Sequence, residues 1–414
     1  IGRGSDSPRG FPFTRRSICG HFGRVFCHGK TNPMGNPIPG EQSAARARIS
    51  RFYSSQAWIE GRAEDQLAQV AAWPGMVAVA GFPDLHPGRF GPVGAAFLAD
   101  RIWPQLVGPD IGCGMALWRL DLPRHRLKID KAVRRLAVMD GGADPEDAAR
   151  ALADAGLEGL IAADGLGSIG GGNHFCEVQA VEEVSNPEAT ALRPGDLCLL
   201  VHSGSRGRGA QIFEGLDDSW KQGYAADSAA AGRYLALHDA AMVWARLNRA
   251  LIAGLAAEAL SCEASLICDS VHNQVVAQDG LWLHRKGAAG ADQGLVPLAG
   301  SRDAPSYLVS VPDLVPEALG SVSHGAGRRY DRASMHGRMR KAKSDLAALT
   351  RNRFGGRVVC EDRDLLMEEA GPAYKNPESV LRDLADFSLA QPIARLVPLI
   401  TFKTAGRAAA GDAE

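Results

Sequence analysis

Several short strings in the chain combine metal-binding side chains with glycine or serine. Asp110 and Cys113 stand three residues apart in the string DIGCG. Imidazole, thiolate and carboxylate are ligands of divalent transition metals, and glycines let backbone N–H groups approach phosphate oxygens. Metal next to phosphate predicts phosphoryl or nucleotidyl transfer. The histidines in such strings are His174 (GGNHF), His202 (HSGSRG), His272 (VHN) and His324 (HGAGR).

Asp110 and Cys113 form the first candidate pair. On a tight turn with Gly112 and Gly114, both side chains can point the same way. A thiolate beside a carboxylate is repelled unless a cation lies between them, which favours a metal site. The alternative is a buried cysteine after a turn aspartate, and the pair alone does not decide between the two.

A single histidine at a strand end is more often structural than a metal ligand. Three together, His174, His202 and His272, each near a predicted strand and next to Asn, Ser or Gly, favour a ligand set. Asn173 and Glu177 flank the first of them and are candidates for nucleotide contacts. Their alternatives are a turn-forming side chain and a surface charge. No chemistry is expected at the histidines in plain polar or helical contexts, which are His125, His238 and His336.

His324 differs because a glycine-rich string and Arg328 follow it directly. A histidine beside such a nest is suited to attack phosphorus, while the nest and the guanidinium take up the developing negative charge. Arg206 and the pair Arg285-Lys286 are candidates to hold further phosphates. Their alternative is an ordinary solvated charge.

Composition sets the frame for these strings. With 414 residues, 45% of them apolar and 22% charged, the chain resembles an ordinary globular enzyme. We expect no membrane span, because no run approaches the roughly 20 apolar residues that one needs. The formal net charge is −1, so nucleic-acid binding must depend on a local basic cluster. The eight cysteines are scattered without a CxxC pair, which favours a reducing cytoplasm.

The predicted elements alternate too irregularly for a doubly wound sheet. We therefore predict a single mixed α+β domain with central β structure surrounded by helices and the active site at strand-end loops. Residues 81–88 read as a turn-rich loop. The predicted strands include residues 76–80, 115–122, 197–201 and 264–268. The predicted helices include residues 58–72, 145–163, 217–260 and 333–349.

In their order along the chain, these strings resemble the RtcB family of RNA-splicing ligases, which join an RNA 3′-phosphate or 2′,3′-cyclic phosphate to a 5′-hydroxyl. The resemblance runs from about residue 58 to residue 403. The strings PDLHPG (83–88) and GCGMALW (112–118) look most like the branch of release-factor-H-coupled RctB proteins. The resemblance implies one catalytic domain over residues 34–414. Residues 1–33 carry six Lys/Arg against one acid and no sustained apolar period, so we expect a disordered leader or upstream extension there.

The resemblance implies a cytoplasmic RNA-repair ligase that depends on two Mn²⁺ ions, with Zn²⁺ able to bind in vitro, and on GTP as co-substrate. His324 falls on the catalytic histidine that becomes guanylylated. The family's metal ligands fall on Asp110, Cys113, His174, His202 and His272, with Cys113 touching both ions. Its GTP contacts fall on Asn173, Glu177, Asn273, Ser301, Ser306, Gly325, Ala326, Gly327 and Lys403. Its RNA- or phosphate-binding arginines fall on Arg206 and Arg328.

Two strings depart from the family pattern. The usual Pro-Gly-Ser-Met-Gly loop reads AGSRD at residues 299–303, and Ala289-Gly290 replaces the usual Thr-Arg. The implied partners are RNA ends, GTP and an archease-like activator or a release-factor-H-like protein, with no membrane. Two alternatives are a metal-dependent RNA-end phosphoesterase and a non-catalytic RNA- or translation-associated factor. The complete ligand set argues against the non-catalytic factor.

Overall fold

The structure is a computed structural model that describes residues 47–292, 294–339 and 347–403. The predicted leader at residues 1–33 lies outside the described residues, and so does part of the predicted helix at 333–349. All structural statements below concern the described part of the chain.

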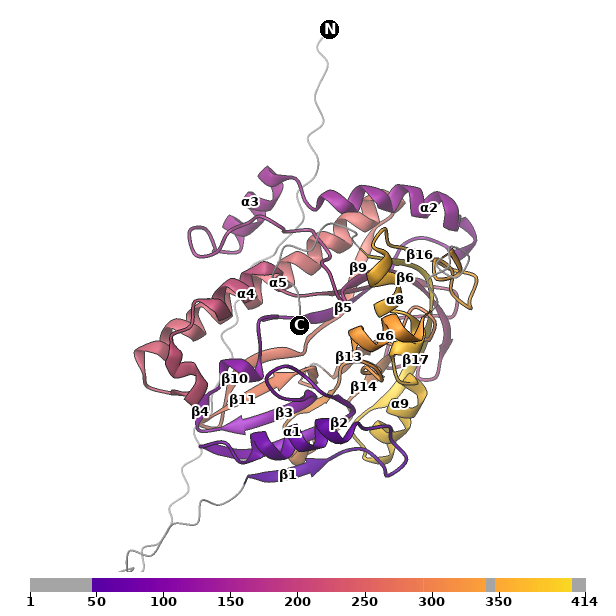
Figure 1. Ribbon diagram of the computed structural model, residues 1–414. Helices are drawn as coiled ribbons and strands as arrows, with labels where there is room; N and C mark the ends of the chain where they lie inside the picture. The colour runs from indigo at the N-terminus through magenta and orange to yellow at the C-terminus, as the bar shows by residue number, and fades with distance from the viewer. Residues whose placement is uncertain (1–46, 293, 340–346, 404–414) are drawn as a thin grey trace, which may run out of the picture. The chain divides into compact units, whose positions relative to one another are not determined.

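An eight-stranded sheet forms the larger β structure (Figure 1). Every residue of its strand β7 (Leu197–Ser203) is buried, as the continuous apolar run in that segment predicts. β16 (Arg357–Val359) pairs with β17 beside the main path. The strand order is β13 (Leu295–Leu298), β14 (Ser306–Ser310), β17 (Gln391–Phe402), β6 (Phe175–Val184), β7, β5 (Gly114–Leu120) and β9 (Ala264–Val271).

A five-stranded sheet is joined to the larger one at a one-residue connection, because β9 ends at Val271 and β10 begins at Asn273. His272 is therefore the single residue between the two sheets. Two short pairs complete the β structure, β12 (Ala288–Gly290) with β15 (Ser321–Ser323) and β4 (Arg101–Ile102) with β8 (Tyr224–Ala225). The order of the five strands is β1 (Arg48–Arg51), β2 (Met76–His86), β3 (Val93–Ala99), β11 (Leu281–Lys286) and β10 (Asn273–Gln278).

The longest helix, α5 (Ala229–Leu260), begins where the Ser228 side chain accepts a hydrogen bond from the N–H of Ala231. It packs on β7, β5 and β9 of the larger sheet. On the side of α5, Figure 1 also shows α2 (Ile129–Leu136), α3 (Pro145–Asp154) and α4 (Gly207–Glu214). The remaining helices are α1 (Gly61–Ala71), which packs on β2, and α6 (Arg332–Arg338), α8 (Arg363–Glu368) and α9 (Pro377–Asp386).

Arg249 of α5 connects this helix to the site. Its fully buried guanidinium forms an ion pair with Asp269, 2.8 Å apart. The NH1 group also donates to the carbonyl oxygens of Gly112 and Ser203, each at 2.9 Å. These two carbonyls adjoin Cys113 and His202 in the chain, so one side chain fixes the backbone beside two predicted metal ligands.

The mixed α+β class is confirmed. The predicted loop at residues 81–88 is wrong over most of its length, because β2 continues to His86. Phe82 and Leu85 are fully buried there, and this burial outweighs the turn preference of Pro83. The helix predicted at 145–163 ends at Asp154. Among the described helices, none is both long and apolar enough to cross a membrane.

Candidate active site

Strand register brings the predicted metal ligands to one edge of the larger sheet. Gly114 at the start of β5 pairs with Ser203 at the end of β7 and with Val271 at the end of β9. Phe175 at the start of β6 pairs with His202. Antiparallel pairing therefore places two strand starts beside two strand ends. The residues at this edge include Cys113, His174, His202 and His272.

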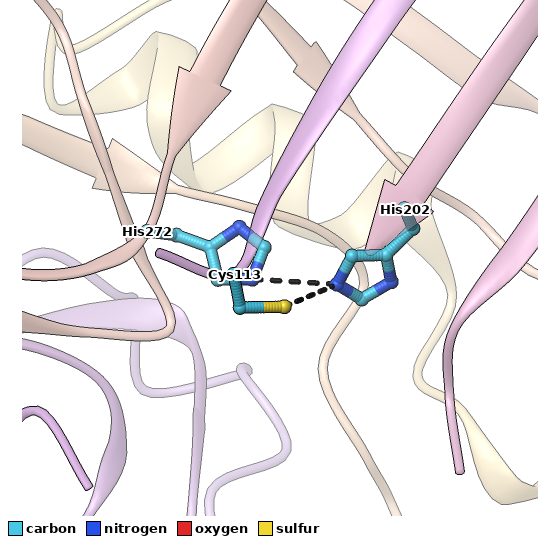
Figure 2. A group of neighbouring side chains, drawn as sticks. All are labelled: Cys113, His202 and His272. Atoms are coloured by element: carbon cyan, nitrogen blue, oxygen red, sulfur yellow. Dashed lines mark hydrogen bonds between the residues drawn. The ribbon is translucent and has the colours of Figure 1, made fainter. Parts of the chain in front are cut away.

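The donor atoms of these side chains converge. Sγ of Cys113 lies 3.3 Å from Nε2 of His174 and 3.2 Å from Nε2 of His202. Nε2 of His202 lies 3.3 Å from Nε2 of His272, and Figure 2 shows both rings and the thiol facing one another. Oδ2 of Asp110 is 3.2 Å from Nε2 of His174. Two candidate metal groups result, Cys113–His202–His272 and Asp110–Cys113–His174, and they share the thiol.

The charge states of the cluster suit cations. Burial and the neighbouring histidines hold the pKa of His202 and of His272 well below the ordinary value, so both rings are neutral and can offer lone pairs. Burial opposes ionisation of Asp110, but the charge and hydrogen bond of His174 outweigh it and lower the pKa of that carboxyl. The cluster therefore combines the neutral imidazoles of His202 and His272 with an ionised carboxylate, the forms that bind a metal.

Burial of the rings gives a second reason for a cation. The Nδ1 atoms of His174 and His272 are buried, and no hydrogen-bond partner for them lies among the described residues. Burying a polar atom without a hydrogen bond costs free energy, so these rings need a strong interaction elsewhere to offset that cost. For both rings that atom is Nε2, which points into the cluster.

His324 lies beside this cluster. Its ring centroid is 4.5 Å from that of His272. Nδ1 of His324 is 2.6 Å from the carbonyl oxygen of Gly287 and 2.8 Å from Oδ2 of Asp84. The hydroxyl of Ser323 donates to the other carboxylate oxygen at 2.9 Å. A ring that donates its Nδ1–H to these acceptors carries its lone pair on Nε2, the form that a nucleophile needs.

Asp84 is fully buried, and sequence reasoning missed it. Burial raises the pKa of its carboxyl, but the hydrogen bond and charge of His324 and the charge of Lys375 outweigh burial and lower it. Lys375 donates to the carbonyls of Pro83 and Leu85 at 3.0 and 2.7 Å, and burial lowers its own pKa to about 8. The string PDLHPG was the available sequence signal for Asp84, but nothing in that string indicates its contact with His324, 240 residues further along the chain.

A cavity of about 440 Å³ opens over the cluster and His324. Cys113, His174 and Arg206 are not among its lining residues, although Cys113 and His174 contact residues that are. The predicted site residues that line it are Asp110, Asn173, Glu177, His202, His272, Asn273, Ser301, Ser306, His324, Gly325, Ala326, Gly327, Arg328 and Lys403.

A buried polar network surrounds Glu177. Its carboxylate accepts hydrogen bonds from Gln179, at 2.6 Å, and from the hydroxyl of Thr401. Gln179 also donates to the hydroxyl of Ser306 at 3.0 Å, which in turn accepts from the N–H of Gly300 at 3.1 Å. Burial raises the pKa of Glu177 to about 7. This carboxyl can therefore change its charge near neutral pH.

Lys403 lies at the end of β17. Its ammonium donates to the carbonyls of Gly172 and His174 at 2.8 and 2.9 Å. Burial lowers its pKa to about 8. The lysine thus holds the loop that carries His174 and places a positive charge beside the cavity.

Arg328 is held by a buried acid. Oε1 of Glu369 lies 3.0 Å from NH1 of Arg328 and 3.2 Å from Nε of Arg332, and Tyr374 donates to the other oxygen. Burial raises the pKa of Glu369, but the charges of Lys403 and the two arginines outweigh burial and lower it to about 2. Glu369 is a second residue that sequence reasoning missed, because it follows the short helix α8 with no motif around it.

The glycine string after His324 packs closely. Gly327 has φ 71°, and a Cβ there would lie 2.3 Å from the carbonyl oxygen of Asp84. The N–H of Ala326 donates to the carbonyl of Ala299 at 2.8 Å. Gly325 forms an isolated β-bridge with Ala299. These contacts fix the string beside the buried carboxylate, and its predicted nucleotide contacts stay a prediction.

Two other predicted nucleotide contacts have structural partners as well. The amide of Asn273 donates to the carbonyl of Asp110 at 3.2 Å and accepts from the N–H of Gly287 at 2.8 Å. The hydroxyl of Ser301 accepts from the N–H of Asp303 at 3.2 Å. Both side chains therefore order the cavity wall.

The remaining predicted arginines lie in different settings. Nε of Arg206 donates to the hydroxyl of Ser168 at 3.3 Å, and its backbone has φ 56°, a value that favours glycine. Arg285 is buried, where it donates to Ser321 at 2.8 Å and to Gly320 at 3.0 Å. The alternative interpretation of Arg285 as a solvated surface charge is therefore wrong. Its neighbour Lys286 lines the cavity.

Comparison with known proteins identifies the family of the chain. The family model described as tRNA-splicing ligase RtcB matches residues 66–141 and 160–404. The chain is 43% identical over 363 residues to an RNA-splicing ligase RtcB2 of Escherichia coli, covering 85% of this chain and 95% of that protein. It is 29% identical to a tRNA-splicing ligase RtcB of Archaeoglobus fulgidus, covering 82% and 91% of the two chains. With this match over most of its length, the chain belongs to the RtcB family and is an RNA ligase.

Proposed function

We propose that this ligase uses GTP and manganese to join RNA 3′-phosphate or 2′,3′-cyclic phosphate ends to 5′-hydroxyl ends through a histidine–GMP intermediate on His324. The observation that carries the proposal is the position of His324. Its Nδ1 is held by Asp84 and Gly287, and its ring packs on His272 inside the cavity. A nucleophile is thus oriented next to candidate metal ligands.

The five clustered side chains, Asp110, Cys113, His174, His202 and His272, would hold two ions, with the thiolate of Cys113 shared. Their mixed sulfur, nitrogen and oxygen donors suit Mn²⁺ better than Mg²⁺, which prefers oxygen ligands and retained water. Ions bound there supply positive charge to phosphate oxygens.

The proposed chemistry has three transfers. Nε2 of His324 attacks the α-phosphorus of GTP, so an N–P bond forms and pyrophosphate leaves. An oxygen of the RNA 3′-phosphate then takes the GMP group, and the N–P bond breaks. The 5′-hydroxyl finally attacks the activated phosphorus and displaces GMP. A cyclic phosphate is first opened by water.

The protein's own residues support these transfers. The Asp84 carboxylate stabilises the positive charge that the ring gains as its lone pair forms the N–P bond. Lys403 and the arginines near Glu369 place positive charge beside the cavity, where the nucleotide phosphates and the RNA end would bind. Glu177, Ser301 and Ser306 line the same cavity and are the proposed nucleotide contacts.

The test is covalent labelling with α-³²P-GTP and Mn²⁺. We expect an acid-labile protein–GMP adduct in the native chain and none in His324→Ala, while the control His125→Ala, at an exposed position, labels normally. Label that persists in His324→Ala contradicts the proposed nucleophile. A chain that opens cyclic phosphates without any adduct is instead a metal-dependent phosphoesterase.

The setting of the reaction is also a proposal. Cys176, Cys198, Cys262, Cys268 and Cys360 are free thiols. A thiolate metal ligand is best preserved in a reducing compartment, which supports a cytoplasmic RNA-repair enzyme. An archease-like activator or a release-factor-H-like protein remains the proposed protein partner. To test this partner, the rate of protein–GMP adduct formation is measured with and without the added protein.

A further inference from the structure

Two aromatic rings and two guanidinium groups contact one another in a partly exposed cluster, here called the rim cluster and defined as Trp58, Arg329, Tyr330 and Arg338. The ring centroids of Trp58 and Tyr330 are 6.1 Å apart at 68°. Cζ of Arg329 lies 5.7 Å from the Trp58 centroid and 5.3 Å from the Tyr330 centroid. Cζ of Arg338 lies 3.8 Å from the Tyr330 centroid. Trp58 is 40% exposed, so its ring is not held by core packing.

The rim cluster adjoins the cavity. Arg329 and Tyr330 line it, and Arg329 is also exposed to solvent, which places this pair where the cavity opens. Glu60 and Arg62, which follow Trp58 in the chain, line the same opening. Tyr330 lies six positions after His324, so their Cα atoms are at most about 22 Å apart, a few nucleotides of an extended strand.

Charge favours a polyanion at this opening. Among the cavity-lining residues exposed to solvent are three arginines, Arg62, Arg89 and Arg329, against two acids, Glu60 and Asp331. Arg338 of the rim cluster adds a further exposed positive charge. The whole chain has a formal net charge of −1, so this excess is local. It is the local basic cluster that nucleic-acid binding requires.

We propose that the rim cluster is a binding subsite for single-stranded RNA, in which Trp58 stacks on an unpaired base close to the end that reaches His324. The inference rests on the assignment of the chain as an RNA ligase. Unpaired RNA bases stack on aromatic rings and guanidinium planes, and such stacking tolerates any base. Arg329 and Arg338 neutralise the neighbouring phosphates. Trp58 and the two arginines thus bind the strand without reading its sequence.

Equilibrium binding of fluorescent RNA tests the subsite without requiring catalysis. One set of oligonucleotides ends in a 3′-phosphate and the other in a 5′-hydroxyl, and each set has one abasic nucleotide at successive positions from that end. In the native chain we expect one position at which loss of the base weakens binding about fivefold or more. In Trp58→Ala, binding of intact RNA falls by a similar factor, and the abasic change at that position has no further effect.

The arginines are tested by salt dependence. Arg329→Ala should reduce the slope of log affinity against log salt by about one unit. Matched controls are Phe387→Ala, an aromatic that is 37% exposed and outside the cavity lining, and Arg126→Ala, an exposed arginine outside it. Both controls should bind RNA as the native chain does.

Two results would overturn the subsite. One is unchanged RNA affinity in Trp58→Ala, which would indicate that the rim cluster binds a protein partner or has no binding role. The other is an abasic effect that is equal in the native chain and in Trp58→Ala. Failure of GTP labelling would contradict the proposed function but leave this binding test intact, so the two proposals fail separately.

Discussion

The imidazole of His324 and the carboxylate of Asp84 form a buried pair, with Nδ1 and Oδ2 2.8 Å apart. The same carboxylate oxygen also accepts the backbone N–H of His324 at 3.2 Å, across a separation of 240 residues. Two contacts to one buried acid fix both the position and the tautomer of the ring.

Asp84→Asn keeps the shape of this acid but removes its charge. We expect the rate of histidine–GMP formation to fall on the order of a hundredfold, because the ring gains positive charge during attack and loses its stabilising partner. Single-turnover labelling measures the rate. Asp65→Asn, on α1 away from the cavity lining, is the control. A rate within about twofold of the native rate would show that the pair only holds structure.

The shared thiol predicts unequal losses of metal. Cys113→Ser should reduce the Mn²⁺ content of both groups, whereas His272→Ala should affect chiefly the group that contains His272. Elemental analysis after dialysis counts the bound ions. Cys262→Ser, at a half-buried cysteine outside the cluster, serves as the control. Equal losses in Cys113→Ser and His272→Ala would argue against a bridging thiolate.

Glu369 predicts an acid-labile part of the site. Its pKa falls from an ordinary 4.5 to about 2 in the folded chain. Because this pKa is depressed, the stabilisation is complete above about pH 4.5 and is lost as the pH falls towards about 2. The shift corresponds to roughly 3 kcal/mol of unfolding free energy. Urea unfolding at a series of pH values should show a shallower acid loss in Glu369→Gln. An unchanged pH profile would contradict the ion-pair account.

The candidate metal ligands could be predicted from the sequence because each lies in a short string next to a strand, and strand ends meet at one end of a sheet. Their convergence follows from antiparallel register, as Gly114 with Ser203 shows. Asp84 and Glu369 could not be predicted from the sequence, because the partners of each carboxylate come from distant parts of the chain and meet it only in the folded structure. The loop predicted at residues 81–88 failed for the same reason, since burial of Phe82 and Leu85 overrides local turn preference.

His272 is the single residue between strand β9 of the larger sheet and strand β10 of the smaller one. A one-residue connection leaves no slack, so any sliding of one sheet past the other must displace this imidazole. An ion bound to His272 would hold the two sheets together at this junction, and its loss would allow one sheet to move relative to the other. We therefore expect a bound ion to stiffen the junction between β9 and β10 in addition to its proposed chemical role.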